Sequence, residues 1–169
     1  MKENFEVDIN KLTEEEKEKF LELVKKGNES IIRKRWRGEE NDAYYSISNR
    51  GILIKDSESG CPVDDCSYQF GNYFKTAEEA NFAREKHFIY QQLSDYALEH
   101  NTEAINWDNN YSDKFFIGYS YKRNELLIRS MRTVKYPNTV YFTSEKIVKD
   151  AIKEIGEDKI KYYLFGVED

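Results

Sequence analysis

The residues that decide the fold are YFKT at positions 73–76, because the pattern returns as YFTS at positions 141–144. In each copy two aromatic residues and a spacer precede a residue type that caps helices, Thr76 in the first and Ser144 in the second. Glu79, three residues after Thr76, completes a capping box. The sequence therefore predicts, twice, a strand-like aromatic segment that leads directly into a helix.

A second match between the two halves lies upstream of these segments. In each half a tryptophan precedes an aromatic pair by eight and nine residues. We interpret the halves as duplicated Trp-led βββα units that jointly bury one core, because one such unit has too little core to be stable alone. The alternative is a chance match, since aromatic strands followed by Thr or Ser caps are common. The matching residues are Trp36, Tyr44 and Tyr45 in the first half and Trp107, Phe115 and Phe116 in the second.

The expected fold class is α+β: two tandem βββα-like units, with antiparallel sheet packed on helices, preceded by an N-terminal helix. A capping box formed by Thr13 and Glu16 predicts that helix. The expected organisation is an N-terminal helical segment at 1–30, a first unit at 31–101 and a second unit at 102–169, in one compact domain. Hydrophobic periodicity and turn residues predict a hairpin at 43–48 and 52–55, an acidic loop at 56–66, a strand at 67–74, a helix at 76–100, strands at 115–121, 125–135 and 139–142, and helices at 144–155 and 158–165.

Composition and charge exclude several classes of protein. The 169 residues are 39% hydrophobic, 15% aromatic and 34% charged, and the formal net charge is −6. No run of about 18 apolar residues is present to cross a membrane, and we identify no signal peptide. We therefore expect a soluble, cytoplasmic protein without membrane contact, and the acidic balance disfavours generic binding of nucleic acid by the whole molecule.

Cysteine and histidine are the first candidates for catalysis or metal binding. Cys61 and Cys66 lie in an acidic segment, which disfavours a reactive thiolate. His87 and His100 are thirteen residues apart in a predicted helix, so their side chains point in different directions. A regular calcium loop and a glycine-rich phosphate loop are also missing. We therefore expect no enzymatic activity, no cofactor and no metal site.

The segment 33–37 carries the densest positive charge in the chain. In a strand, Arg33, Arg35 and Arg37 would share one face, with Trp36 on the other. That face could contact phosphates, with a second contribution from basic residues near position 130, so a nucleic acid is one candidate partner. The alternative is that these arginines pair with the acidic first helix and with the acidic loop at 56–66. The second contribution would come from Arg129, Arg132 and Lys135.

Thirteen tyrosines are the least ordinary feature of the composition. Tyr119 and Tyr121 are among those expected to be partly exposed. Rigid aromatic rings of this kind serve protein interfaces, and they also stack on bases. The alternative is that tyrosine is frequent only because an A+T-rich genome favours it. The candidate binding residues are Arg33, Arg35, Trp36, Arg37, Tyr119, Tyr121, Arg129 and Arg132.

Several stretches resemble small accessory proteins carried by phages and prophages of Firmicutes. The resemblance covers most of residues 11–168, and its most specific part is FGNYFKTAEEA at 70–80. It implies an accessory gene of a mobile element that acts inside a bacterial cell. We therefore expect a non-enzymatic protein that binds a host protein and inhibits an antiviral defence system. The other stretches that carry the resemblance are RWR at 35–37, AYYSI at 43–47, VYFTS at 140–144 and EIGED at 154–158.

Overall fold

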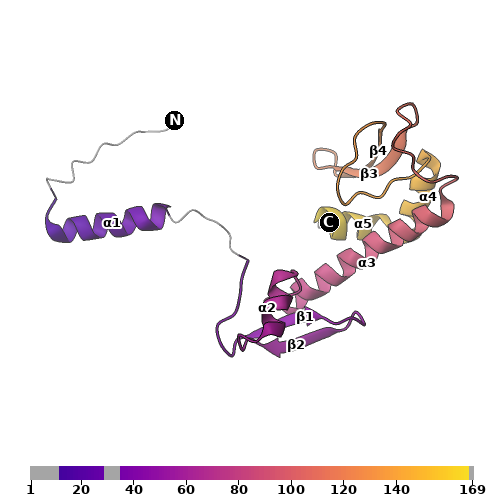
Figure 1. Ribbon diagram of the computed structural model, residues 1–169. Coiled ribbons are helices and arrows are strands. Elements are labelled where there is room, and N and C mark those ends of the chain that lie inside the picture. Colours follow the sequence, from indigo (N-terminus) through magenta and orange to yellow (C-terminus); the bar gives the residue numbers. More distant parts are fainter. Residues whose placement is uncertain (1–11, 29–34, 168–169) are drawn as a thin grey trace. The chain divides into compact units, whose positions relative to one another are not determined.

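The computed structural model describes residues 12–28 and 35–167 (Figure 1). The chain divides into two units, residues 1–36 and residues 37–169. The first unit contains helix α1 (Glu14–Asn28). The Thr13 backbone N–H donates to the Glu16 carboxylate at 2.8 Å, and the Glu16 backbone N–H donates to Thr13 Oγ1 at 3.3 Å. The predicted capping box and the predicted N-terminal helix are thereby confirmed.

The second unit is built from two antiparallel hairpins, each followed by helices (Figure 1). The α+β class, the hairpin positions and the helix-capping roles of Thr76 and Ser144 are confirmed. The backbone N–H of Glu79 donates to Thr76 Oγ1 at 3.2 Å, and that of Ile147 donates to Ser144 Oγ at 3.3 Å. The elements are β1 (Ala43–Ile47), β2 (Leu53–Ser57), α2 (Pro62–Gln69), α3 (Ala77–His100), β3 (Lys114–Ser120), β4 (Glu125–Met131), α4 (Glu145–Ile155) and α5 (Glu157–Phe165).

The third strand predicted in each half is reduced to one pair of bridged residues. Tyr45 and Phe74 exchange two backbone hydrogen bonds of 2.8 and 2.9 Å, and Phe115 and Phe142 do the same at 2.9 and 2.8 Å. In the first half the Asn72 side chain occupies the next pairing position. Its amide accepts from the Ile47 backbone N–H and donates to the Ile47 carbonyl. A side chain therefore satisfies the backbone where the sequence predicted a continuing strand.

Helix α2 replaces the second part of the predicted acidic loop and the start of the predicted strand at 67–74, so both predictions were wrong there. Pro62 occupies the first turn, where its missing N–H costs nothing. Asp64, three residues after Cys61, accepts a hydrogen bond from the Cys61 backbone N–H at 3.2 Å. These residues begin a helix although cysteine is not a usual capping residue. Strand β4 also ends earlier than predicted, at Met131 rather than at residue 135.

The bridges show which positions of the two halves correspond. Tyr45 and Phe115 hold the same place in their hairpins, so the strands match at an offset of 70 residues rather than the 71 that the tryptophan spacing indicates. The preceding residues, Tyr44 and Lys114, therefore also correspond, and both are buried. The Tyr44 hydroxyl donates to Asp64 at 2.8 Å. The Lys114 ammonium donates to the carbonyls of Asn109, Ser112 and Arg132 at 2.5, 3.0 and 3.0 Å.

Helix α3 belongs to both halves of the second unit. Its N-terminal part packs on β1 and β2, and it also packs on α4 and α5. Apolar side chains on α3 repeat at helical spacing and face the core. Gly156, at a φ of 104°, gives the chain the turn between α4 and α5 that lets both helices cover this core. The buried core residues are Ile89, Leu93, Tyr96, Ala97, Phe142, Val148, Ala151, Ile155 and Ile160.

Candidate functional site: a groove along helix α3

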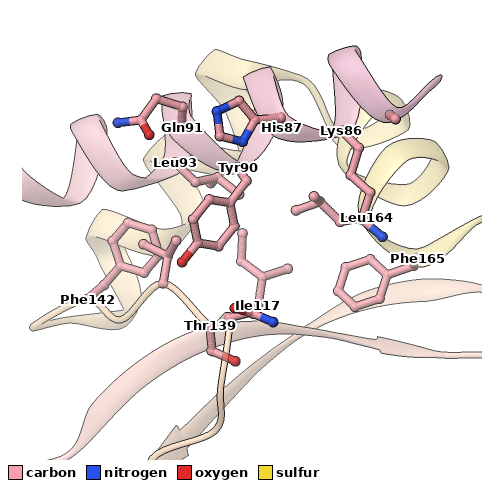
Figure 2. Close-up of a pocket in the computed structure, with 13 residues that line it drawn as sticks. Lys86, His87, Tyr90, Gln91, Leu93, Ile117, Thr139, Phe142, Leu164 and Phe165 are labelled. Carbon is pink, nitrogen blue, oxygen red and sulfur yellow. The ribbon is translucent and has the colours of Figure 1, made fainter. Parts of the chain in front are cut away.

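A cavity of about 650 Å³ opens beside α3, between that helix, strand β3, the segment 138–142 and the end of α5 (Figure 2). Cavities of this size accommodate small ligands or several side chains of a partner. The floor is apolar, and the rim carries amide, hydroxyl and basic side chains. The lining residues are Ala83, Lys86, His87, Tyr90, Gln91, Leu93, Ile117, Asn138, Thr139, Val140, Phe142, Leu164 and Phe165.

A second hollow, of about 580 Å³, continues the first one along α3. The two share Tyr90, Thr139 and Val140, so we treat them as one feature, the α3 groove. The lining residues at 83, 87, 90, 94 and 97 of α3, and Asn101 at its C-cap, alternate in steps of four and three, which places them on one face of the helix. The distance along the helix from Ala83 to Asn101 is about 27 Å at 1.5 Å per residue.

The wall opposite α3 is the segment 138–142, and its backbone is held at several points. The Tyr141 hydroxyl accepts from the Tyr136 backbone N–H at 2.7 Å. The Asn101 side chain at the end of α3 donates to the Tyr141 carbonyl at 3.1 Å and accepts from the Thr143 backbone N–H at 2.9 Å. Phe142 is fixed by its bridge to β3. These contacts preorganise the groove, which reduces the ordering cost of binding.

The first hollow is basic, although the chain as a whole is acidic. Its lining contains Lys86 and His87 and no carboxylate. Within the described part of the chain, neither side chain has a hydrogen-bond or ion-pair partner. Figure 2 shows Lys86 reaching from α3 toward Leu164, and Tyr90 entering the cavity with its hydroxyl directed toward the far wall. The hollow therefore presents free donors above an apolar floor.

The predicted residues Tyr119 and Tyr121 lie together and reach this hollow through Phe165. The Tyr119 ring stacks on Phe165 at 5.6 Å and meets Tyr121 edge-on at 5.0 Å. The Tyr119 hydroxyl donates to Asn124, and the Tyr121 hydroxyl donates to the Phe165 carbonyl at 3.0 Å. Tyr121 is 76% exposed. An accessible aromatic cluster therefore adjoins one end of the groove.

Two of the predicted basic residues, Arg37 and Arg132, pair with carboxylates of their own unit. Arg37 binds Glu58 through two hydrogen bonds of 3.0 and 3.1 Å and binds Asp65 at 2.7 Å. These bonds, to Glu58 first and to Asp65 second, raise the pKa of the Arg37 guanidinium. Arg132 pairs with Asp113 at 2.9 Å, which raises the pKa of Arg132 and lowers that of Asp113. For these two arginines the alternative of internal pairing is the one that the structure supports.

The remaining residues of the predicted binding set differ in their exposure, and one of them lies outside the described chain. Arg35 and Arg129 are exposed, and Trp36 is half-buried. The Arg129 side chain lies beside Gly118 of β3, where a Cβ atom would stand 3.3 Å from Arg129 Cγ. Arg33 lies outside the described residues. Arg37 and Arg132 are held in different halves of the second unit, so they belong to no common cluster.

A buried polar network fixes the loop that holds Arg37. Glu58 accepts from Arg37, from the Tyr73 hydroxyl at 2.8 Å and from the Gly60 backbone N–H at 2.9 Å. The Arg37 contact is the main cause of the lowered pKa of Glu58. Burial, together with the Glu58 carboxylate, raises the pKa of Tyr73 to about 12. All these groups are satisfied by one another, so the network is structural and leaves no polarised nucleophile.

Asp64 is the second carboxylate of this network. It accepts from the Tyr44 hydroxyl, the Ser59 hydroxyl and the backbone N–H groups of Ser59 and Cys61. The Ser59 backbone donor contributes most to the strongly lowered pKa of Asp64, and Tyr44 contributes next. Burial, and then the Asp64 carboxylate, raises the pKa of Tyr44. The Tyr44 ring stacks on the ring of Tyr73 at 4.0 Å, which joins the two carboxylate clusters.

The remaining candidates for chemistry show no reactive arrangement in the described residues. Cys61 and Cys66 are unbonded to each other. His100 stacks on Tyr96 and lies 3.0 Å from the Tyr96 carbonyl. Within residues 12–28 and 35–167 no group of three His, Cys, Asp or Glu side chains could hold a metal ion. No helix in the same ranges is both long and apolar enough to span a bilayer.

Most groove residues were missed by the sequence analysis, although one signal was available. Ala83, Tyr90 and Ala97 recur every seven residues beside the core stripe of α3, which made the apolar face of this helix wider than one packing contact needs. Lys86, His87 and Phe165 carried no such signal, because only the tertiary fold brings α5 to α3.

Comparison of the chain with protein-family models, with curated proteins and with solved structures finds no significant match.

Proposed function

We propose that this chain is a non-enzymatic accessory protein of a mobile genetic element and that it binds a protein of its bacterial host in the cytoplasm. The α3 groove is the binding surface in this proposal. A component of antiviral defence, which the chain would inhibit, is the first class of target to test, because the resemblance to phage and prophage proteins supplies that setting.

The observation that carries this proposal is an apolar groove that continues for about 27 Å along a preorganised helix. Grooves of this shape bind helices or extended segments of partner proteins through anchors spaced along them. The cluster of Tyr119, Tyr121 and Phe165 adds accessible aromatic surface at one end, and aromatic residues carry much of the energy of protein interfaces.

The groove supports binding better than catalysis. Among its lining residues in the described chain, no hydroxyl or thiol is hydrogen-bonded to an imidazole or to a carboxylate. Nucleophilic catalysis needs such a base beside the nucleophile. Binding of nucleic acid is also less well supported, because Arg37 and Arg132 already pair with carboxylates and offer less free charge to phosphates.

We further propose that the two halves of the second unit are duplicated units of βββα type in which the third strand has been shortened to its bridge. The corresponding bridges, Tyr45 with Phe74 and Phe115 with Phe142, support this origin. In both halves the helix cap stands two residues after the bridge, at Thr76 and at Ser144. In this proposal the groove is formed by helix α3, which both halves share, together with strand β3, the segment 138–142 and α5 of the C-terminal half.

The proposed function is tested by capturing host proteins on the full chain. Thr139 lines both hollows, so Thr139→Trp is expected to fill their junction. Thr133→Trp is the matched control, because Thr133 is exposed and lies outside the lining. A host protein retained by the wild type and by Thr133→Trp, and lost from Thr139→Trp, supports the proposal. Equal retention of every host protein by both variants contradicts it.

A further inference from the structure

We infer that the segment bound in the α3 groove is an acidic, apolar peptide of the partner, whose carboxylate meets Lys86 and His87 while a large apolar side chain enters the cavity below them. This inference rests on the proposed function and adds the chemistry of the bound segment.

The charge of the first hollow argues for an acidic partner. The chain has 32 acidic and 26 basic residues, so an average surface would repel a carboxylate. The first hollow differs, because Lys86 and His87 line it without any carboxylate. In the described chain neither side chain has a charged partner, so a carboxylate of a bound peptide would displace no internal ion pair. Complementary charge of this kind raises association rates and excludes wrong partners.

The floor of the hollow argues for an apolar anchor beside that carboxylate. Leu93 and Phe142 are buried beneath the cavity, and Leu164 and Phe165 form the end nearest to Lys86 (Figure 2). A cavity of about 650 Å³ is larger than one aliphatic side chain needs, so an aromatic anchor or two aliphatic anchors fit it. Anchors buried in such pockets provide most of the binding energy of an interface.

The far end of the groove sets the direction of the peptide. Glu103 lines the second hollow, where Lys86 and His87 do not reach. A carboxylate of the peptide is therefore favoured at the Ala83 end of α3 and disfavoured at the Asn101 end. The two ends are about 27 Å apart along the helix, which a partner helix of about 18 residues or an extended segment of about 8 residues would span.

The test uses the full chain and a displayed library of random 12-residue peptides. Peptides selected on the wild type are expected to be enriched in Asp or Glu together with Phe, Leu or Ile. A selected peptide is expected to bind Lys86→Glu about tenfold more weakly, as for loss of a charge-assisted contact that becomes repulsive. Lys122→Glu is the control, because Lys122 is exposed in the β3–β4 turn and changes the net charge equally. Its affinity is expected to stay within about twofold of the wild type.

The inference and the proposed function can fail separately. Selected peptides that are basic or uncharged, or that bind Lys86→Glu as tightly as Lys122→Glu, overturn the inference and leave the proposed function standing. The inference is also overturned, and the proposed function stands, if no peptide is selected while a host protein is retained by the wild type and lost from Thr139→Trp. If neither a peptide nor a host protein distinguishes Thr139→Trp from Thr133→Trp, both are overturned. Thermal unfolding of each variant shows whether it is folded at the temperature of the assay.

Discussion

Removal of the Tyr44 hydroxyl tests the buried network in the most direct way. In the wild type the Tyr44 hydroxyl donates to Asp64 at 2.8 Å. In Tyr44→Phe the ring can still stack on Tyr73, but Asp64 loses this donor. A hydrogen bond to a charged group contributes about 1.5–3 kcal/mol, so we expect the free energy of unfolding to fall by about 2 kcal/mol. For a unit of this size that loss lowers Tm by about 7 °C, measured by differential scanning calorimetry.

The same variant has a signature in the pH dependence of stability. Hydrogen bonds lower the pKa of Asp64 in the folded chain, so its stabilisation is complete above the unfolded-state pKa of about 3.9 and is lost as pH falls through the folded value. Without the Tyr44 donor the folded pKa of Asp64 moves back toward its ordinary value. The acid-induced loss of stability below about pH 5 should therefore be shallower in Tyr44→Phe than in the wild type.

A double-mutant cycle with Asp64→Asn separates this contact from general damage to the core. The amide keeps the shape of Asp64 but removes its charge, so Tyr44→Phe should cost about 1 kcal/mol less in that background. Urea unfolding of the four proteins measures the coupling free energy. Equal costs of Tyr44→Phe in both backgrounds, or an unchanged pH profile, would refute the role assigned to the hydroxyl.

The remaining predictions concern both halves of the second unit. Thr76→Ala and Ser144→Ala should each lower the free energy of unfolding by about 1 kcal/mol, because each removes a helix cap. The conservative control Thr76→Ser should cost less than about 0.5 kcal/mol. Alanine variants as stable as the wild type in urea titrations would contradict the capping roles. Lys114→Met should cost about 3 kcal/mol, because the buried ammonium and its hydrogen bonds to three carbonyls are lost. Chemical unfolding at the level of an exposed Lys122→Met control would disprove this. Gly156→Ala should cost about 2 kcal/mol because a φ of 104° strains a residue with a Cβ atom, and an unchanged Tm would count against that strain.

Local chemistry was sufficient to predict much of the fold. The caps at Thr13, Thr76 and Ser144 were predicted correctly, because each depends on interactions within about four residues. The hairpins were predicted for the same reason, since a short turn fixes their register.

The errors have one local and one long-range cause. The aromatic residues at 67–74 favour a strand, but Asp64 accepts from the Cys61 backbone N–H and begins a helix there, although cysteine is not a usual capping residue. Asn72 binds Ile47, 25 residues away, and gives a side-chain bridge where a strand was predicted. A side-chain amide that substitutes for a strand has no periodic signal in sequence. The tryptophan spacing predicted an offset of 71 residues between the two hairpins, whereas the bridges give 70, because only the bridges reveal which strand residues hold the same place.

The candidate site was the least predictable part. Charge density singled out Arg37 and Arg132, yet nearby carboxylates bind both. Tyr119 and Tyr121 were identified and do adjoin the groove, through Phe165. The groove itself is formed by α3, the segment 138–142 and the end of α5, which are separated by tens of residues in sequence and meet only after folding.

Site-specific photo-crosslinking in host cells tests the binding role of the α3 groove most directly, because it requires no knowledge of the partner. Benzoylphenylalanine is introduced at Thr139, inside the groove, and in a second protein at Thr133, outside it. We predict a discrete higher-mass adduct with a host protein from position 139, and its loss when Lys86→Glu is added. Adducts of equal yield from position 133, or none from position 139 while position 133 reacts, would contradict a partner site in the groove.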